Sequence, residues 1–209
     1  AAEPALSPHA RGVSMRVLGA IIAGGQSRRM GGQEKAFVTL GGITLMERVI
    51  SRIAPQVEEV VINANGDAAR FARFGQRVVA DVLDTGTPLA GLHAVLCLGQ
   101  REGFDAVLTV PSDSPFLPLN LVARLADAGA QTGAAVAASG GQVHHLTGLW
   151  SSAIGCKLDE LMRARTMQRV MDLAVVFDVA AAAWETEPVD PFLNLNTPAD
   201  LALAEQQLA

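Results

Sequence analysis

Short apolar runs alternate along this chain with stretches in which apolar residues recur every three or four positions. Such runs, bounded by glycine, proline or polar residues, are typical of buried strands, and the longer spacing is typical of amphipathic helices. The runs predict strands at residues 17–23, 59–66, 77–82, 106–110, 134–138, 143–150 and 174–179, with 143–150 at an edge of the sheet. The helical spacing predicts helices at residues 43–53, 88–98, 119–128, 154–164, 166–173 and 198–208.

The alternation of strands and helices predicts an α/β fold. Right-handed crossovers place helices on both faces of a twisted sheet whose strands are mainly parallel. With 209 residues, 50% of them hydrophobic, the chain can bury one good core, and no repeat or linker divides it. We therefore predict a single domain over residues 15–209. We expect residues 1–14 to be a disordered extension or residues left from cloning.

Charge and composition argue against several classes of protein. The formal net charge of −5 disfavours binding to nucleic acid, which normally requires a basic face. No apolar run approaches the roughly 20 residues that cross a bilayer, so a membrane span is not expected. Cys97 and Cys156 are too few for a disulfide framework and indicate a protein of the reducing cytoplasm.

The strongest local signal follows the first predicted strand. Residues 24–32 contain four glycines and two arginines, and Lys35 comes shortly after them. A strand that leads into such a loop exposes backbone N–H groups at the carboxyl edge of a sheet, where polyphosphates bind. Arg29 can pair with phosphate oxygens through its forked guanidinium, and Lys35 can supply a mobile positive charge.

Two better-known phosphate loops do not match this segment. A Walker loop has Lys directly after its last glycine and then Ser or Thr, whereas Lys35 is separated from Gly32 and precedes Ala36. The dinucleotide motif G-x-G-x-x-G is absent from the loop because its glycines come in adjacent pairs. A surface loop with solvated arginines is the alternative, and the combination of strand, paired glycines, Arg29 and spaced lysine disfavours it.

Polar side chains follow other predicted strands at the same edge. Asp113 lies in a turn between prolines. There it is either a ligand of Mg²⁺, which needs few carboxylates beside waters and substrate phosphates, or a helix cap or turn residue. Asp81 and Asn63 are candidates for recognition of a nucleoside. The carboxylate of Asp81 would accept from N1–H and the amino group of guanine or from ribose hydroxyls, or it is a turn residue without such a role.

These segments also resemble a known family. Nucleotidyltransferases that join a nucleotide to a phosphorylated acceptor share a signature similar to Ile22-Ala23-Gly24-Gly25-x-Ser27-x-Arg29-Met30-Gly31-x-x-x-Lys35. The paired glycine resembles most the molybdenum cofactor guanylyltransferase family. Residues 111–115 resemble its Pro-x-Asp-x-Pro metal motif, and residues 194–198 resemble its Asn-x-Asn-Thr-Pro motif. Residues 86–91 resemble its Gly-Pro-Leu-Ala-Gly motif but contain an additional Thr87.

The resemblance implies a Rossmann-like nucleotidyltransferase fold and a role for each matching residue. Arg29, Lys35 and Asp113 would be catalytic, and Asp113 would bind Mg²⁺, or alternatively Mn²⁺. The residues that would contact the nucleotide are Ile22, Ala23, Gly24, Gly25, Lys35, Asn63, Asp81 and Asp113. The residues that would contact the acceptor are Asn194, Asn196 and His145.

Local geometry limits some of these roles. Asn194 and Asn196 alternate onto one face of an extended strand, so both can meet the site, whereas Thr197 is expected to cap the helix that follows. His144 and His145 are adjacent on a predicted strand and face opposite ways, so we do not expect them to share a metal ion.

The resemblance implies transfer of GMP from GTP to molybdopterin that carries molybdenum, with release of pyrophosphate. It adds client molybdoenzymes or their chaperones as partners. The residues by themselves support a Mg²⁺-dependent nucleotidyltransferase. The alternatives are a molybdopterin cytidylyltransferase, a sugar-phosphate nucleotidyltransferase, and a non-catalytic module that binds nucleotide or molybdopterin for delivery.

Overall fold

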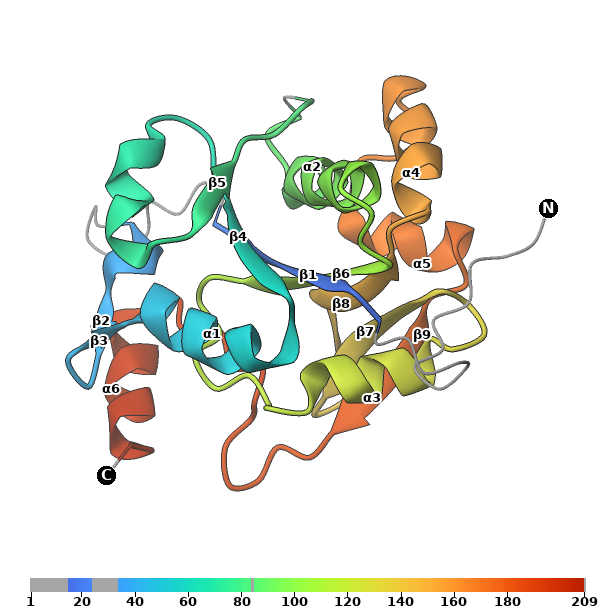
Figure 1. Ribbon diagram of the computed structural model, residues 1–209. Coiled ribbons are helices and arrows are strands. Elements are labelled where there is room, and N and C mark those ends of the chain that lie inside the picture. The colour runs from blue at the N-terminus through green and yellow to red at the C-terminus, as the bar shows by residue number, and fades with distance from the viewer. Residues whose placement is uncertain (1–14, 24–33, 84, 209) are drawn as a thin grey trace.

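The computed structural model describes residues 15–23, 34–83 and 85–208. At its centre lies a seven-stranded sheet in the order β5-β4-β1-β6-β8-β7-β9 (Figure 1). Its strands are β1 (Val17–Ile22), β4 (Glu59–Asn63), β5 (Arg77–Val79), β6 (Ala106–Pro111), β7 (Ala134–Ser139), β8 (Gln142–Ser151) and β9 (Ala180–Trp184). The expected extension 1–14 and the glycine-rich loop 24–33 lie outside the described residues.

All strands of this sheet except β8 point the same way. β5, β4, β1 and β6 are parallel neighbours, β8 is antiparallel to β6 and β7, and β9 is parallel to β7. The prediction of a mainly parallel sheet is therefore confirmed. The carboxyl ends of β1, β4, β5 and β6 meet at one edge, which is where ligands bind in such sheets.

Helices cover both faces of the sheet, as predicted (Figure 1). α1 and α3 pack on one face, and α2, α4 and α5 pack on the other. The helices are α1 (Leu45–Ile53), α2 (Pro88–Arg101), α3 (Leu121–Ala128), α4 (Ile154–Arg163), α5 (Leu173–Val176) and α6 (Pro198–Gln206). Short 3₁₀ turns are η1 (Lys35–Phe37), η2 (Ala54–Gln56), η3 (Ala68–Phe74) and η4 (Val170–Asp172). None of the helices in the described residues is long and apolar enough to cross a membrane.

β1 shows how the sequence produces this layering. Val17 and Ile21 belong to the core beneath α1 and α3, and Leu18, Ala20 and Ile22 belong to the core beneath α2 and α4. Because alternate side chains of a strand point to opposite faces, a strand covered on both faces needs a continuous apolar run.

A small hairpin precedes α1. Its strands are β2 (Thr39–Leu40) and β3 (Ile43–Thr44). The helix predicted from residue 43 therefore begins at Leu45, and Thr44 caps it in a capping box with Glu47. α6 packs against β2, in a third cluster of buried side chains that includes Leu195.

The prediction that residues 143–150 form an edge strand is wrong. β8 lies between β6 and β7, and its residues 147–151 are buried. Pairing with β6 runs only from Gly148 to Ser151, so the first half of β8 extends past β6 and pairs with β7 alone. The edge position was predicted because this first half contains the polar residues His144 and His145.

The predictions of a helix at 166–173 and a strand at 174–179 are also wrong. Of residues 166–179, only 170–176 are regular, as η4 and the single turn of α5, and the others form no helix or strand. Val175 is 88% exposed and Asp178 has a φ of 48°, so this apolar run does not enter the sheet. The strand comes later, as β9, whose residues are mostly alanine and carry little strand preference.

Candidate active site

The glycine-rich loop leaves the sheet at the carboxyl end of β1, between β4 and β6. Ile22 and Ala23 are buried at this point, and the Ala23 N–H donates to the Asn63 carbonyl oxygen (2.9 Å). The predicted phosphate contacts that lie outside the described residues are Gly24, Gly25 and Arg29.

Lys35 and Asp113 form an ion pair at this edge. Lys35 begins η1 after the loop, and Asp113 lies in the turn that follows β6. Lys35 Nζ donates to Asp113 Oδ2 (2.7 Å) and to Asn196 Oδ1. The side chains of the ion pair are only 13% and 14% exposed. The fold therefore brings together three predicted site residues from distant segments, and Lys35 does not lie on a solvated face.

Asp113 has one carboxylate oxygen available for another ligand. Its Oδ1 is buried and accepts no hydrogen bond from the residues that the structure describes, whereas Oδ2 is held by Lys35. A buried carboxylate oxygen without a partner is unfavourable, and a divalent cation would supply the partner. Within the described residues, no group of three or more His, Cys, Asp or Glu side chains is arranged to hold a metal ion. The donor set thus fits an ion such as Mg²⁺, which takes its other ligands from waters and substrate phosphates.

The alternative role of Asp113 as a helix cap does not fit the structure. α3 begins only at Leu121, with Asn120 at its cap position. The backbone carbonyl of Asp113 accepts from the Leu195 N–H (3.0 Å), so the turn is tied to the C-terminal segment. The carboxylate is left to face Lys35 and the edge of the sheet.

Two asparagine side chains hold Asp81 just beyond the end of β5. Asn63 Nδ2 donates to Asp81 Oδ1 (2.9 Å) and to the Val79 carbonyl oxygen (3.1 Å). Asn65 Nδ2 donates to Asp81 Oδ2 (2.7 Å), and Asn65 Oδ1 accepts from the Asp81 N–H (2.9 Å). Each carboxylate oxygen keeps a further lone pair for a ligand. Asn63 is only 1% exposed, so the role that its contacts indicate is support of Asp81.

Asn65 is a candidate that the sequence did not single out. It lies exposed after β4, and both ends of its amide group bind Asp81. The polar stretch after the β4 run was visible in the sequence. The contact itself was not, because it requires that β4 and β5 lie side by side in parallel register.

Gly91 in α2 gives Asn63 the space that it occupies. A Cβ at Gly91 would lie 2.2 Å from Asn63 Oδ1 and 3.3 Å from Ile22 Cγ2. Gly→Ala in a helix normally stabilises by about 1 kcal/mol, whereas overpacking a core typically costs about 1–3 kcal/mol. We expect Gly91→Ala to lower the melting temperature and to weaken nucleotide binding, since Asn63 would be pushed away from Asp81. Thermal unfolding and a nucleotide titration measure both effects. A variant with the parental melting temperature and affinity would contradict this account.

The segment that carries Asn194 and Asn196 is irregular and not the predicted strand. Both asparagines are nevertheless exposed, on either side of the buried Leu195. Asn194 Oδ1 accepts from Ser114 Oγ (2.6 Å), and Asn196 contacts Lys35. Asn194 therefore binds Ser114, which follows Asp113 in the sequence, and Asn196 binds Lys35, which pairs with Asp113.

Thr197 caps α6 as predicted. Its hydroxyl accepts from the Asp200 N–H (3.1 Å), and Asp200 Oδ2 accepts from the N–H groups of Asn196 and Thr197 (2.8 Å each). These backbone donors, with a smaller effect of Lys35, hold the pKa of the Asp200 carboxyl below its usual range. The Asp200 carboxylate therefore stays ionised, and its hydrogen bond to the Asn196 N–H helps to hold the backbone of Asn196 beside Lys35.

His145 lies in the half of β8 that extends past β6, near the carboxyl end of β7. It is partly buried. His144 beside it points to the other face and contacts Ser139, so the two rings do not converge on one ion, as expected.

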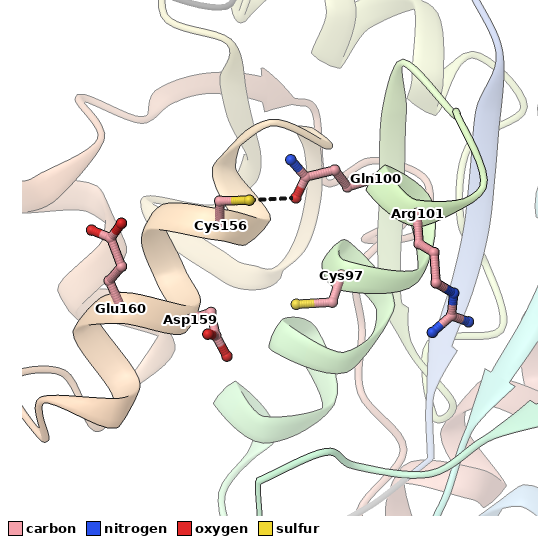
Figure 2. A pocket seen from close by; sticks show the side chains of 6 residues that line it. All are labelled: Cys97, Gln100, Arg101, Cys156, Asp159 and Glu160. Atoms are coloured by element: carbon pink, nitrogen blue, oxygen red, sulfur yellow. Dashed lines mark hydrogen bonds between the residues drawn. The ribbon is translucent and has the colours of Figure 1, made fainter.

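A separate cavity of about 490 Å³ lies between α2 and α4 (Figure 2). It is lined by Cys97, Gln100, Arg101, Cys156, Asp159 and Glu160. These residues lie toward the C-terminal end of α2, which leads to the amino end of β6, away from Lys35 and Asp113. Burial raises the pKa of the Cys97 thiol, which opposes formation of a reactive thiolate. This cavity is not part of the candidate active site.

A buried lysine–aspartate pair at the carboxyl edge of a mainly parallel sheet is the arrangement expected of a nucleotidyltransferase. The family model for the MobA-like NTP transferase domain matches residues 19–183. The molybdenum cofactor guanylyltransferase of Nitrobacter hamburgensis is 44% identical over 196 residues, which cover 91% of this chain and 94% of that protein. The chain belongs to the molybdenum cofactor guanylyltransferase family.

Solved structures show the same fold. Molybdopterin-guanine dinucleotide biosynthesis protein A from Archaeoglobus fulgidus superimposes with a TM-score of 0.71 at 21% identity, covering 91% of this chain and 98% of that chain. A Mycobacterium tuberculosis protein in complex with manganese superimposes with a TM-score of 0.62 at 17% identity, covering 92% of this chain and 99% of that chain. At these identities the likeness concerns the fold alone.

Proposed function

We propose that this chain transfers GMP from GTP to molybdopterin that carries molybdenum, forming molybdopterin guanine dinucleotide and releasing pyrophosphate. Membership of the guanylyltransferase family supports the overall reaction. The observation that carries the proposal is the state of Asp113, which has Lys35 on one carboxylate oxygen and, among the described residues, no partner on the other, buried one. Binding of a nucleotide for delivery alone would not require such a group.

The chain contributes position and charge to this reaction. An oxygen of the acceptor's terminal phosphate attacks the α-phosphorus of GTP in line, and the bond from that phosphorus to the departing pyrophosphate breaks. No covalent intermediate on the chain is needed. The backbone amides of Gly24 and Gly25 and the guanidinium of Arg29 hold the phosphates, and Lys35 meets the negative charge that develops on the leaving group.

Asp113 is the residue that would hold Mg²⁺ or Mn²⁺ through its buried Oδ1. When bound, such an ion polarises the α-phosphate and neutralises part of its charge. The manganese complex of a protein with the same fold supports a divalent cation as cofactor. Lys35 fixes the orientation of the Asp113 carboxylate by holding the other oxygen.

Asp81 is proposed to recognise the guanine base. Guanine presents N1–H and an amino group side by side, and one carboxylate accepts from both, whereas cytosine lacks this pair. The clamp formed by Asn63 and Asn65 supports this role because it fixes the carboxylate without using all its lone pairs. Contact with ribose hydroxyls is the alternative role. Ile22 and Ala23 would line the nucleotide at the base of the loop.

The acceptor would bind on the β6–β8 side of Asp113, against Asn194, Asn196 and His145. The attachment of Asn194 to Ser114 and of Asn196 to Lys35 supports this, and His145 lies in the part of β8 that extends past β6. Delivery of the product to client molybdoenzymes or their chaperones and a cytoplasmic location complete the proposal. Cys97 and Cys156 are free thiols in the structure, which suits a reducing compartment.

The choice of nucleotide tests the proposed function. We expect GTP to be preferred over CTP by at least roughly a hundredfold in kcat/KM, because a base pocket with unpaired polar groups rejects the wrong base. Transfer to molybdopterin is measured with each nucleotide separately, and a sugar phosphate serves as control acceptor. A preference for CTP would assign the cytidylyltransferase activity, and binding without transfer would assign the delivery module.

A further inference from the structure

A second polar cluster lies at the carboxyl end of β7, outside the groups assigned above. Ser139 is the last residue of β7 and is only 3% exposed. Its Oγ donates to the carboxylate of Asp190, at 2.8 Å from Oδ1 and 3.0 Å from Oδ2. Asp190 lies in the connection from β9 to α6. The same Oγ lies 2.8 Å from Nε2 of His144 on β8. One hydroxyl thus joins three segments of the chain.

The hydrogen-bonding groups assign the protons in this cluster. Ser139 has one hydroxyl hydrogen, and it goes to Asp190 because an ionised carboxylate only accepts. His144 must then donate from Nε2 to Ser139 Oγ, which assigns its neutral ring to the Nε2–H tautomer. Burial lowers the pKa of His144, with His145 acting in the same direction and Asp190 against it. The ring is therefore neutral at neutral pH.

Asp190 transmits this fixed position to the residues that follow it. Its Oδ1 accepts from the Phe192 N–H (2.9 Å), and its carbonyl oxygen accepts from the Leu193 N–H (3.2 Å). The Phe192 ring is buried between His144 and Trp184, with centroid distances of 4.9 and 5.1 Å. Polar and aromatic contacts together fix the turn at 190–193.

The next residues of the same segment reach the catalytic pair. Asn194 accepts from Ser114, the Leu195 N–H donates to the Asp113 carbonyl oxygen, and Asn196 accepts from Lys35. Residues 185–197 contain no helix or strand, so no regular backbone pairing sets their position. Asp200 holds the Asn196 N–H from the α6 side, so the remaining question is what holds the segment at its other end, before Asn194.

We propose that the cluster of Ser139, His144 and Asp190 is the N-terminal anchor of the segment 190–196, and that together with the α6 cap at Asp200 it sets the position of Asn194 and Asn196 against Lys35 and Asp113. Its members are positioning residues, because they act on the site through the segment 190–196. The inference rests on the proposed function, since positioning is measured partly through guanylyl transfer.

Asp190→Ala tests the anchor. We expect kcat to fall by about tenfold to a hundredfold, because small displacements of positioning groups have effects of this size, while the KM for GTP stays close to that of the parent. Asp190→Asn is the conservative variant. Its Oδ1 can still accept from Ser139 and Phe192, so it should recover most of the lost kcat. Glu185→Ala, which removes an exposed carboxylate from the same connection, is the matched control and should match the parent.

The rate of hydrogen exchange at the Leu195 amide gives a test that does not depend on activity. Hydrogen exchange at this N–H should accelerate in Asp190→Ala and in Ser139→Ala but not in Glu185→Ala. Ser139→Ala and Asp190→Ala break the same link, so the double variant should lose no more kcat than the more impaired single variant. If Asp190→Ala does not fold, Ser139→Ala decides by the same measurements.

Different outcomes separate the anchor from the proposed function. Parental kcat together with slow Leu195 exchange in Asp190→Ala would overturn the anchor. A loss of kcat in Asp190→Asn as large as in Asp190→Ala would also overturn it, because charge rather than attachment would then matter. If the parent transfers no GMP while Leu195 exchange still responds as expected, the proposed function fails and the anchor stands.

Discussion

Asp113→Asn is expected to lower the kcat of guanylyl transfer by about a thousandfold, because a metal ion at a phosphoryl group supplies several kcal/mol and each 1.4 kcal/mol changes the rate tenfold. The amide has the shape of the carboxylate and can still accept from Lys35. It lacks the negative charge that would hold a hard cation at the buried Oδ1 position. Extra Mg²⁺ should therefore restore activity poorly.

Stability separates the proposed role of Asp113 from a structural one. The tie between the Asp113 turn and the C-terminal segment uses the backbone carbonyl, which the substitution leaves in place. We expect a melting temperature within a few degrees of the parent. Asp127→Asn on the exposed side of α3 is the matched control for loss of a carboxylate and should keep full activity. If Asp113→Asn melts like the parent and keeps most of its activity, the metal site lies elsewhere.

The parts of the fold that the sequence predicted are those where a local signal in the sequence agrees with the burial of the element. β1 and β6 are covered on both faces, and a continuous apolar run is the pattern that such a buried strand requires. Pro88, in the first turn of α2, predicted the start of that helix, and the Thr197 cap predicted the start of α6. In each case the local signal and the tertiary environment favour the same element.

The parts that the sequence missed depend on partners far away in the chain. β9 is a strand because it pairs with the edge of β7. Its four alanines have little preference for strand and do not predict one by themselves. β8 lies inside the sheet because its apolar half inserts between β6 and β7, although its polar half looks like an edge. Apolar residues 174–176 form one exposed helical turn, which no periodicity rule separates from a strand.

The candidate site divides in the same way. Lys35, Asp81 and Asp113 were predictable because each follows a strand end, and parallel strands deliver their carboxyl ends to one edge. The contacts that hold them were not predictable, since Asn65 and Asn196 reach their partners across 16 and 161 positions. Ser139 and Asp190 form a similar long-range pair. Sequence patterns thus predict which groups meet at the edge, and the fold determines how each is oriented.

Lys35→Ala is expected to lower kcat by about a hundredfold, since removing a charged group that meets developing negative charge typically costs about 3 kcal/mol of the barrier. Binding of GDP should change far less, because the loop amides and Arg29 are proposed to hold the phosphates in the ground state. Steady-state kinetics and a GDP titration measure the two effects separately.

The same substitution should leave the requirement for Mg²⁺ unchanged or lower it. Lys35 Nζ now lies 2.7 Å from Asp113 Oδ2, and its loss removes a positive charge from the carboxylate that would bind the cation. Asp113→Asn should have the opposite effect on Mg²⁺ affinity, so the two variants distinguish a group that acts on the substrate from one that holds the metal. Lys157→Ala, which removes the other lysine of the chain from its exposed pair with Glu160, is the matched control. Turnover of Lys35→Ala close to that of Lys157→Ala would limit Lys35 to orienting Asp113 and Asn196.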